Sequence, residues 1–169
     1  NGYIRDCFFG NTNGYGIYSA HSQEWLIEHN FFAECNRGVF YSTVPASSRV
    51  RDNSFINEGS TVCDFAASYE PGTLGGTGAA SFENNYIIGH NYGIHITSCK
   101  GFNLQSNMFE ACKKTAIVVS TTTFDGTNLG FSSSTIPNVS IIGNSWLAIG
   151  EDNSGGYAVV LRNLRDSVF

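Results

Sequence analysis

Apolar and polar positions along this chain follow a short frame that recurs from one end to the other. An apolar residue is followed by two variable positions, a position that is mostly Asn, one variable position and a second apolar residue. The seven copies begin at Ile4, Ile27, Val50, Phe82, Leu104, Ile141 and Leu164. The Asn position holds Cys7, Asn30, Asn53, Asn85, Asn107, Asn144 and Ser167, with spacings of 23, 23, 32, 22, 37 and 23 residues. Four spacings are nearly equal, which indicates a structural repeat of this length.

A second apolar segment follows the Asn position of each of the first six copies, mostly by about nine residues, and mostly begins at Gly or Ala. The segments are YGIY near Ile17, GVFY near Val39, TVCDF near Val62, YGIHI near Ile94, AIVV near Ile117 and YAVVL near Val159. All apolar segments are short and lie between turn signals, whereas an amphipathic helix keeps its 3.6-residue period over roughly ten residues or more. We therefore expect three short strands per repeat: one before the Asn position, one after it and one at the Gly.

Strand repeats of this length predict a solenoid of stacked rungs, because one repeat cannot bury its own apolar face. Leucine-rich repeats have a similar length but need several leucines per copy, and this chain is poor in Leu. The pattern predicts an all-β fold, a single-stranded right-handed parallel β-helix of about seven rungs that forms one domain over residues 1–169. The pattern is already running at Tyr3 and Ile4 and stops within a rung at Phe169, without polar caps, so we interpret the chain as an excerpt of a longer one.

Each column of the aligned repeats predicts a physical stack, because equivalent residues of successive rungs lie about 4.8 Å apart. The Asn column predicts a ladder of amide hydrogen bonds at a tight turn, where Asn tolerates left-handed backbone angles. The column two residues later predicts an aromatic stack of Phe9, Phe32, Phe55, Ile87, Phe109, Trp146 and Phe169. The column two residues before Asn predicts exposed ion pairs among Arg5, Glu28, Arg51, Glu83 and Gln105. Next to it, a solvated edge or a second carboxylate cleft is expected along Asp6, His29, Asp52 and Asn84.

Composition excludes several classes of protein. A hydrophobic content of 41% with 14% charged residues favours a packed domain over disorder. The net charge of −5 with nine Lys and Arg argues against nucleic acid as a partner. No apolar run is long enough for a membrane span, and the N-terminal residues do not form a signal peptide. The cysteines are odd in number and lack CxxC spacing, so we expect reduced, buried side chains and neither a metal site nor a cofactor: Cys7, Cys35, Cys63, Cys99 and Cys112.

The gapped Ile-x-x-Asn-x-Phe and Gly-Ile pattern covers essentially the whole chain and resembles the pectate-lyase-like superfamily of right-handed parallel β-helices. Within that superfamily, the short irregular rungs, the reduced cysteines and the missing secretion signal are most similar to bacteriophage tailspikes. Tailspikes are homotrimers that cleave bacterial surface polysaccharide. The resemblance therefore implies a viral protein of the virion tail, assembled in the host cytoplasm, that attaches to the host cell and acts outside it as a glycoside hydrolase on capsule or O-antigen. No tailspike motif transfers catalytic residues onto this chain.

The two long spacings predict where chemistry could be placed. They hold insertions at about residues 66–80 and 120–137, which we expect to leave the same turn and to wall a groove over rungs four and five. Tolerated insertions or trimer contacts are the alternative. Glycoside hydrolysis needs two carboxylates, roughly 5 Å apart for retention or roughly 6.5–9.5 Å apart for inversion. Around the groove, the catalytic candidates are Glu70, Glu83 and Asp125, and Asp64 and Glu110 are further acids. For Glu83, the ion-pair column is the competing role.

Aromatic and basic residues supply candidates for substrate binding. His95 is predicted to point outward in an apolar stripe, whose other members are Tyr18, Phe40, Cys63, Val118 and Val160. Such a stripe predicts trimer packing or a platform for sugar rings, with Tyr69 and Tyr92 as further platform residues.

Three lysines in the turns of rung five form a basic cluster: Lys100, Lys113 and Lys114. They would serve solubility, or they would neutralise a uronate or sialate carboxylate. The second role predicts a polysaccharide lyase rather than a hydrolase. A non-catalytic adhesin or structural stalk is the remaining alternative.

Overall fold

The computed structural model describes residues 2–20, 24–42, 47–59, 63–70, 79–97, 101–119, 136–150, 156–161 and 164–165. Within these ranges the chain is all-β, with strands and no helix. Accordingly, no helix in the described ranges is long and apolar enough to cross a membrane.

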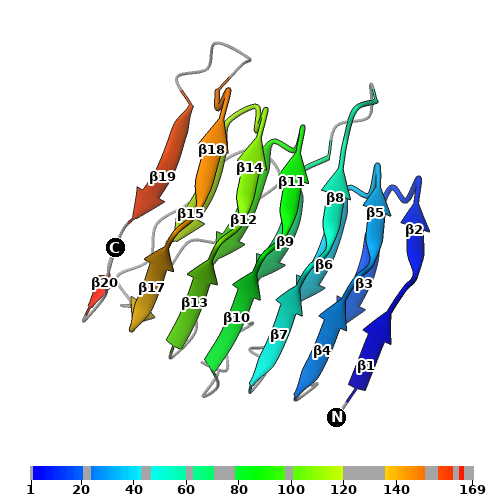
Figure 1. The fold of residues 1–169 in the computed structure, drawn as a ribbon, viewed down its shortest axis with the longest axis horizontal. Helices are drawn as coiled ribbons and strands as arrows, with labels where there is room; N and C mark the ends of the chain where they lie inside the picture. Colours follow the sequence, from blue (N-terminus) through cyan, green and yellow to red (C-terminus); the bar gives the residue numbers. More distant parts are fainter. Residues whose placement is uncertain are drawn as a thin grey trace.

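Three six-stranded parallel sheets make up the fold, and each repeat contributes one strand to each sheet (Figure 1). Sheet 1 contains β1 (Gly2–Arg5), β4 (Trp25–Glu28), β7 (Ser48–Arg51), β10 (Ala79–Glu83), β13 (Gly101–Gln105) and β17 (Val139–Ile142). Sheet 2 contains β2 (Phe8–Gly10), β5 (Phe31–Ala33), β8 (Ser54–Ile56), β11 (Tyr86–Ile88), β14 (Met108–Glu110) and β18 (Ser145–Leu147). Sheet 3 contains β3 (Tyr15–Ser19), β6 (Arg37–Tyr41), β9 (Phe65–Tyr69), β12 (Tyr92–Ile96), β15 (Thr115–Val119) and β19 (Tyr157–Leu161). The all-β prediction with three strands per repeat is confirmed, and the arrangement is consistent with a parallel β-helix.

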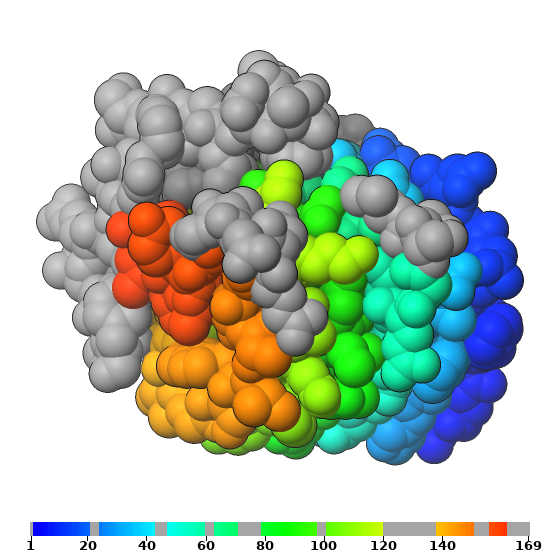
Figure 2. Space-filling view, turned by 90° about the horizontal axis from the view of Figure 1, so that it is seen from above, coloured from blue at the N-terminus to red at the C-terminus, as the bar shows by residue number. Residues whose placement is uncertain are grey.

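Each strand pairs with the equivalent strand of the next repeat, so the chain builds a stack along its length. Figure 2 shows this succession as adjacent bands across one face of the molecule. In sheet 1, Ile4 aligns with Ile27, Phe82 with Leu104, and Leu104 with Ile141, so the first six copies of the frame are in register. The seventh copy stays a prediction, because β20 (Leu164–Arg165) pairs with β16 (Ile136–Pro137) and residues 166–169 lie outside the described ranges.

The aromatic column forms a stack in the core. Ring centroids lie 4.8 Å apart for Phe9 and Phe32, and 4.6 Å apart for Phe32 and Phe55. Ile87 and Phe109 continue the column and are fully buried. Trp146 takes the next position in the register but is 45% exposed, so the prediction of a buried ring is wrong there. Phe169 lies outside the described residues.

Glycine in sheet 3 makes room for this stack. A Cβ atom at Gly38 would lie 2.5 Å from Cδ1 of Phe55, and one at Gly93 would lie 2.5 Å from Cδ1 of Phe109. In the third repeat the same position is Ala66, and the following repeat has Ile87 in place of Phe. At Gly38 and Gly93 the ring of the next repeat occupies the space that a side chain would need, and Ala66 stands where the smaller Ile87 follows.

The Asn ladder is confirmed by hydrogen bonds. Each amide Nδ2 donates to Oδ1 of the next Asn, at 3.0, 3.0, 3.1 and 2.9 Å along Asn30, Asn53, Asn85, Asn107 and Asn144. The expectation that Asn itself adopts left-handed angles is wrong. The positive φ values, between 53° and 64°, belong to the residue before it, namely Asp6, His29, Asp52, Asn84, Ser106 and Gly143. This preceding residue turns the chain, which leaves the Asn side chain buried and free to join the ladder.

One strand lies later in the sequence than the pattern predicts. The TVCDF segment around Val62 was expected to form the third-repeat strand of sheet 3, but β9 covers Phe65–Tyr69. Extra residues separate β8 from β9, because β8 ends at Ile56 and β9 begins at Phe65. Part of the first insertion, predicted at about residues 66–80, thus precedes β9 rather than following it, and Ser68 instead of Cys63 aligns with His95.

The cysteines behave as buried small side chains with one exception. Cys35, Cys63 and Cys112 are buried and free, as predicted, whereas Cys7 is exposed. Cys7 occupies the Asn position of the first repeat. Its backbone N–H donates to Oδ1 of Asn30, the next residue of the ladder. Cys99 lies outside the described residues.

Candidate functional site

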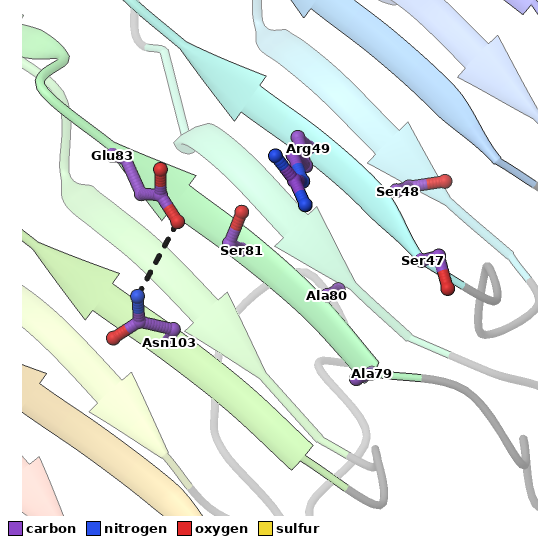
Figure 3. A pocket seen from close by; sticks show the side chains of 8 residues that line it. All are labelled: Ser47, Ser48, Arg49, Ala79, Ala80, Ser81, Glu83 and Asn103. Atoms are coloured by element: carbon purple, nitrogen blue, oxygen red, sulfur yellow. Dashed lines mark hydrogen bonds between the residues drawn. The ribbon is translucent and has the colours of Figure 1, made fainter.

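A shallow trough crosses the outer face of sheet 1 over strands β7, β10 and β13 (Figure 3). It has a volume of about 350 Å³ and is lined by Ser47, Ser48, Arg49, Ala79, Ala80, Ser81, Glu83 and Asn103. Alternation along β10 places Ala80 and Phe82 in the core, so Ser81 and Glu83 face outward. Ser81 aligns with Arg49 on one neighbouring strand and with Asn103 on the other. The trough exists because the short side chain of Ser81 lies between the longer side chains of Arg49 and Asn103.

The hydroxyl of Ser81 lies at the floor of this trough. Ser81 is only 8% exposed, and its Oγ has no hydrogen-bond partner within the described part of the chain. In Figure 3 its side chain projects to the same side of the sheet as those of Arg49 and Glu83. A buried hydroxyl without a partner costs about 1–3 kcal/mol, so this position favours a ligand that supplies the missing hydrogen bond.

Two charged side chains flank Ser81 without pairing to each other. Arg49 has no ion pair among the described residues, and its side chain is exposed. Glu83 accepts a hydrogen bond from Asn103 Nδ2, at 3.3 Å. Both Glu83 oxygens therefore keep acceptor capacity, and the Arg49 guanidinium keeps its donors.

The predicted ladder of ion pairs is confirmed at one step only. Arg51 Nη2 lies 2.7 Å from Glu28 Oε2, and Arg5 binds its neighbour Asp6 at 2.8 Å instead of Glu28. Glu28 also accepts a hydrogen bond from the Tyr3 hydroxyl, and its side chain is 6% exposed, so it is not the solvated residue that was expected. The hydrogen bonds from Tyr3 and Arg51 lower the pKa of Glu28. Because Arg51 pairs with Glu28, Glu83 has no ion pair among the described side chains.

In the next column, at the predicted solvated edge, His29 Nε2 lies 3.9 Å from the carboxylate of Asp52. Both side chains are partly exposed, which fits a solvated edge better than a closed carboxylate cleft.

Glu70 belongs to a different face of the solenoid. Its carboxylate accepts hydrogen bonds from the Ser68 hydroxyl and from His95 Nδ1, the latter at 3.3 Å, and Arg37 Nη1 lies 4.0 Å away. All of these partners are on sheet 3, whereas Glu83 is on sheet 1. Burial raises the pKa of Glu70, but the hydrogen bonds from His95 and Ser68 and the nearby positive charges outweigh it, so the pKa lies below its usual range. The described contacts therefore do not join Glu70 and Glu83 into one carboxylate pair.

His95 lies on the outer face of sheet 3, as predicted, but it is fully buried. Its ring stacks on Phe65 with centroids 5.3 Å apart, and its Nε2 has no hydrogen-bond partner among the described residues. Phe40 and Val118 in the same column are also buried, whereas Tyr18 is 55% exposed. The expectation of a continuous exposed stripe is therefore wrong for the middle repeats.

Two proposed sugar platforms are covered. Tyr69 points into the core, where its ring stacks on Tyr41 at 4.9 Å and meets the edge of Phe102 at 4.7 Å. It cannot present an exposed ring, because alternation along β9 turns Ser68 outward and Tyr69 inward. Tyr92 is on the outer face of sheet 3 but is buried against Phe65, with ring centroids 5.2 Å apart.

The other nominated residues do not join the trough. Lys113 and Lys114 lie in the turn between β14 and β15, where Lys114 Nζ is 5.6 Å from the centroid of the Tyr92 ring. Glu110 accepts a hydrogen bond from the Tyr86 hydroxyl at 2.6 Å on sheet 2. Lys100 and Asp125 lie outside the described residues, as do most residues of both predicted insertions.

The trough contributes three functional candidates that the sequence reasoning missed, Arg49, Ser81 and Asn103. All three occupy the column four residues before Asn, which alternation places on the outer face. The sequence feature that could have identified them is the change in side-chain size along that column. No group of three or more His, Cys, Asp or Glu side chains in the described ranges could hold a metal ion.

The fold is an all-β stack of parallel strands with a polar trough on the outer face of one sheet. No protein-family model, curated protein or solved structure matches the chain.

Proposed function

We propose that this chain is part of a bacteriophage tailspike, a right-handed parallel β-helix of the virion tail, and that it binds bacterial surface polysaccharide along the outer face of sheet 1. One observation carries the binding site: the buried, unpartnered hydroxyl of Ser81 lies between Arg49 and Glu83 in a trough open to solvent. Equivalent outward positions recur at about 4.8 Å across the strands, so an extended glycan meets a regular series of polar side chains.

Hydrolysis is the second part of the proposal. Glu83 is the carboxylate that lines the trough, and it is proposed as one of the two carboxylates that act as acid and base at a glycosidic bond. Glu70 directly follows β9 and its described partners are all on sheet 3, so it does not supply the second carboxylate at the trough, and Asp125, the remaining candidate, lies outside the described residues. The homotrimer and the assembly in the host cytoplasm belong to the same proposal through the resemblance to tailspikes.

The test uses a panel of purified capsular and O-antigen polysaccharides. Binding is measured by calorimetry, and cleavage is followed through new reducing ends and the ultraviolet absorbance of unsaturated uronate. Glu83→Gln should retain binding and lower turnover by about 10²-fold or more. Glu58→Gln, at an exposed carboxylate in the turn after β8, is the matched control and should leave turnover unchanged.

Each outcome selects one function. Reducing ends without absorbance support the hydrolase, whereas absorbance identifies a lyase. Binding without cleavage leaves an adhesin or a structural stalk, and the absence of binding to every polysaccharide refutes the proposed function.

A further inference from the structure

We infer that the trough on sheet 1 recognises the acetamido group of an N-acetylated amino sugar. The inference rests on the proposed binding of glycans at this face and names the chemical class of sugar that the trough selects.

The trough has a donor end and an acceptor end. At the donor end, Arg49 on β7 offers guanidinium N–H groups that no described carboxylate uses. At the acceptor end, Glu83 offers carboxylate oxygens. Asn103 directs its Nδ2 toward Glu83 and Gln105, at 3.3 and 3.4 Å, so its Oδ1 is the atom left for a ligand. Ser81 lies between the two ends and can donate or accept through its unpartnered hydroxyl.

Charged ligand groups match only half of this arrangement. A uronate carboxylate would pair with Arg49, but it only accepts hydrogen bonds and would meet the like charge of Glu83. A free amino group on a sugar would pair with Glu83 and meet the charge of Arg49. The trough carries one charge of each sign, so it favours a neutral group that accepts at one end and donates at the other.

A secondary amide meets both requirements over a short distance. Its carbonyl oxygen accepts from Arg49 or Ser81, and its N–H donates to Glu83. The acetyl methyl group adds an apolar end, for which the exposed methyl group of Ala79 provides the apolar contact in the lining. Sugar hydroxyls could replace the amide in the hydrogen bonds but would leave the Ala79 methyl without an apolar partner.

The experiment compares three soluble trisaccharides with the same β-1,4 linkage: the trimer of N-acetylglucosamine, its de-N-acetylated form and the glucose trimer. Affinities come from titration calorimetry, and saturation-transfer NMR identifies the sugar protons that contact the protein. The N-acetylated trimer should bind at least tenfold more tightly than either relative, and its acetyl methyl protons should receive the strongest saturation.

Variants assign that preference to the trough. Ser81→Ala and Arg49→Gln should each weaken binding of the N-acetylated trimer by about tenfold, which corresponds to one lost hydrogen bond to the ligand. Ser81→Ala removes no hydrogen bond to any described residue, so the unfolding transition of this variant should stay in place. Ser140→Ala, in the same outward column on β17 but outside the lining, is the matched control.

Two results overturn the inference. One is equal binding, or no binding, of the three trimers; the other is a preference for the acetyl group that survives both trough variants. Either result leaves the proposed function to be decided separately by the polysaccharide panel, because that panel does not depend on acetylation.

Discussion

Asn85, in the middle of the Asn ladder, allows a direct test of the packing argument. Its Oδ1 accepts hydrogen bonds from the backbone N–H and from Nδ2 of Asn53, both at 3.0 Å. Its Nδ2 donates to the carbonyl oxygen of Val50 at 2.9 Å and to Oδ1 of Asn107 at 3.1 Å. The residue is 2% exposed, so water cannot replace these partners without opening the turn.

The substitution Asn85→Ala removes all four hydrogen bonds at once. At a net value of about 1 kcal/mol each, their loss lowers the free energy of unfolding by about 4 kcal/mol. The buried backbone N–H of Asn53 loses its side-chain acceptor, which raises the expected loss to about 5 kcal/mol.

Urea denaturation followed by far-ultraviolet circular dichroism measures this loss. Asn91→Ala is the control, because the Asn91 side chain is partly exposed and makes a single long hydrogen bond, 3.5 Å, to Asp64. We expect the control to lose less than about 1 kcal/mol. If Asn85→Ala is no more damaging than Asn91→Ala, the amide ladder does not hold the turns together and the reasoning is refuted.

Three further predictions concern the core and its response to acid. Phe55→Ala should lower the free energy of unfolding by about 3–5 kcal/mol, because it opens a cavity in the ring stack; a loss below about 1 kcal/mol would contradict its buried position. Gly38→Ala should destabilise the fold in the same assay, since the new Cβ would lie 2.5 Å from both the Phe55 ring and the carbonyl oxygen of Ala66, and unchanged stability would argue against this close packing. Burial lowers the pKa of His90 to about 4, so the unfolded chain binds the extra proton first as pH falls below about 6.5, and stability is lost between about pH 6.5 and 4. Wild type should lose about 2–3 kcal/mol more than His90→Gln between pH 7 and 4.5, and equal losses would contradict a buried neutral His90.

The sequence predicted the position of a residue in the fold wherever the equivalent residues of successive rungs have the same structural role. Asn85 and Phe55 could be placed because their columns keep one residue type through several repeats, and a constant spacing means a constant position in the stack. Strand β9 was misplaced because TVCDF is also apolar and Val62 lies at the expected nine residues after Asn53, whereas extra residues separate β8 from β9. A local apolar pattern does not distinguish two neighbouring segments when an insertion separates strands.

The site was less accessible to sequence reasoning than the fold. Alternation shows which face His95 lies on, but its burial depends on what covers that face. Glu83 was correctly assigned to an outward column. Its lack of an ion pair with Arg51 could not be predicted, because the guanidinium of Arg51 could pair with Glu28 or with Glu83 and the structure shows the pair with Glu28. The trough itself arises from differences in side-chain length along the column of Arg49, Ser81 and Asn103, and this column stands out by a change in side-chain size rather than by a constant residue type.

The Gly and Ala positions of sheet 3 also bear on how the chain avoids stacking its rungs in the wrong order. Repeats of nearly equal length could exchange places, since a strand shifted by one whole repeat would keep every backbone hydrogen bond and every inward or outward orientation. The pairing of Gly38 with Phe55 and of Ala66 with a repeat that has Ile87 makes the repeats unequal. A phenyl ring brought over Ala66 would meet a methyl group where Gly38 and Gly93 leave space, so this position favours the repeat that has Ile87 as the neighbour of the third repeat.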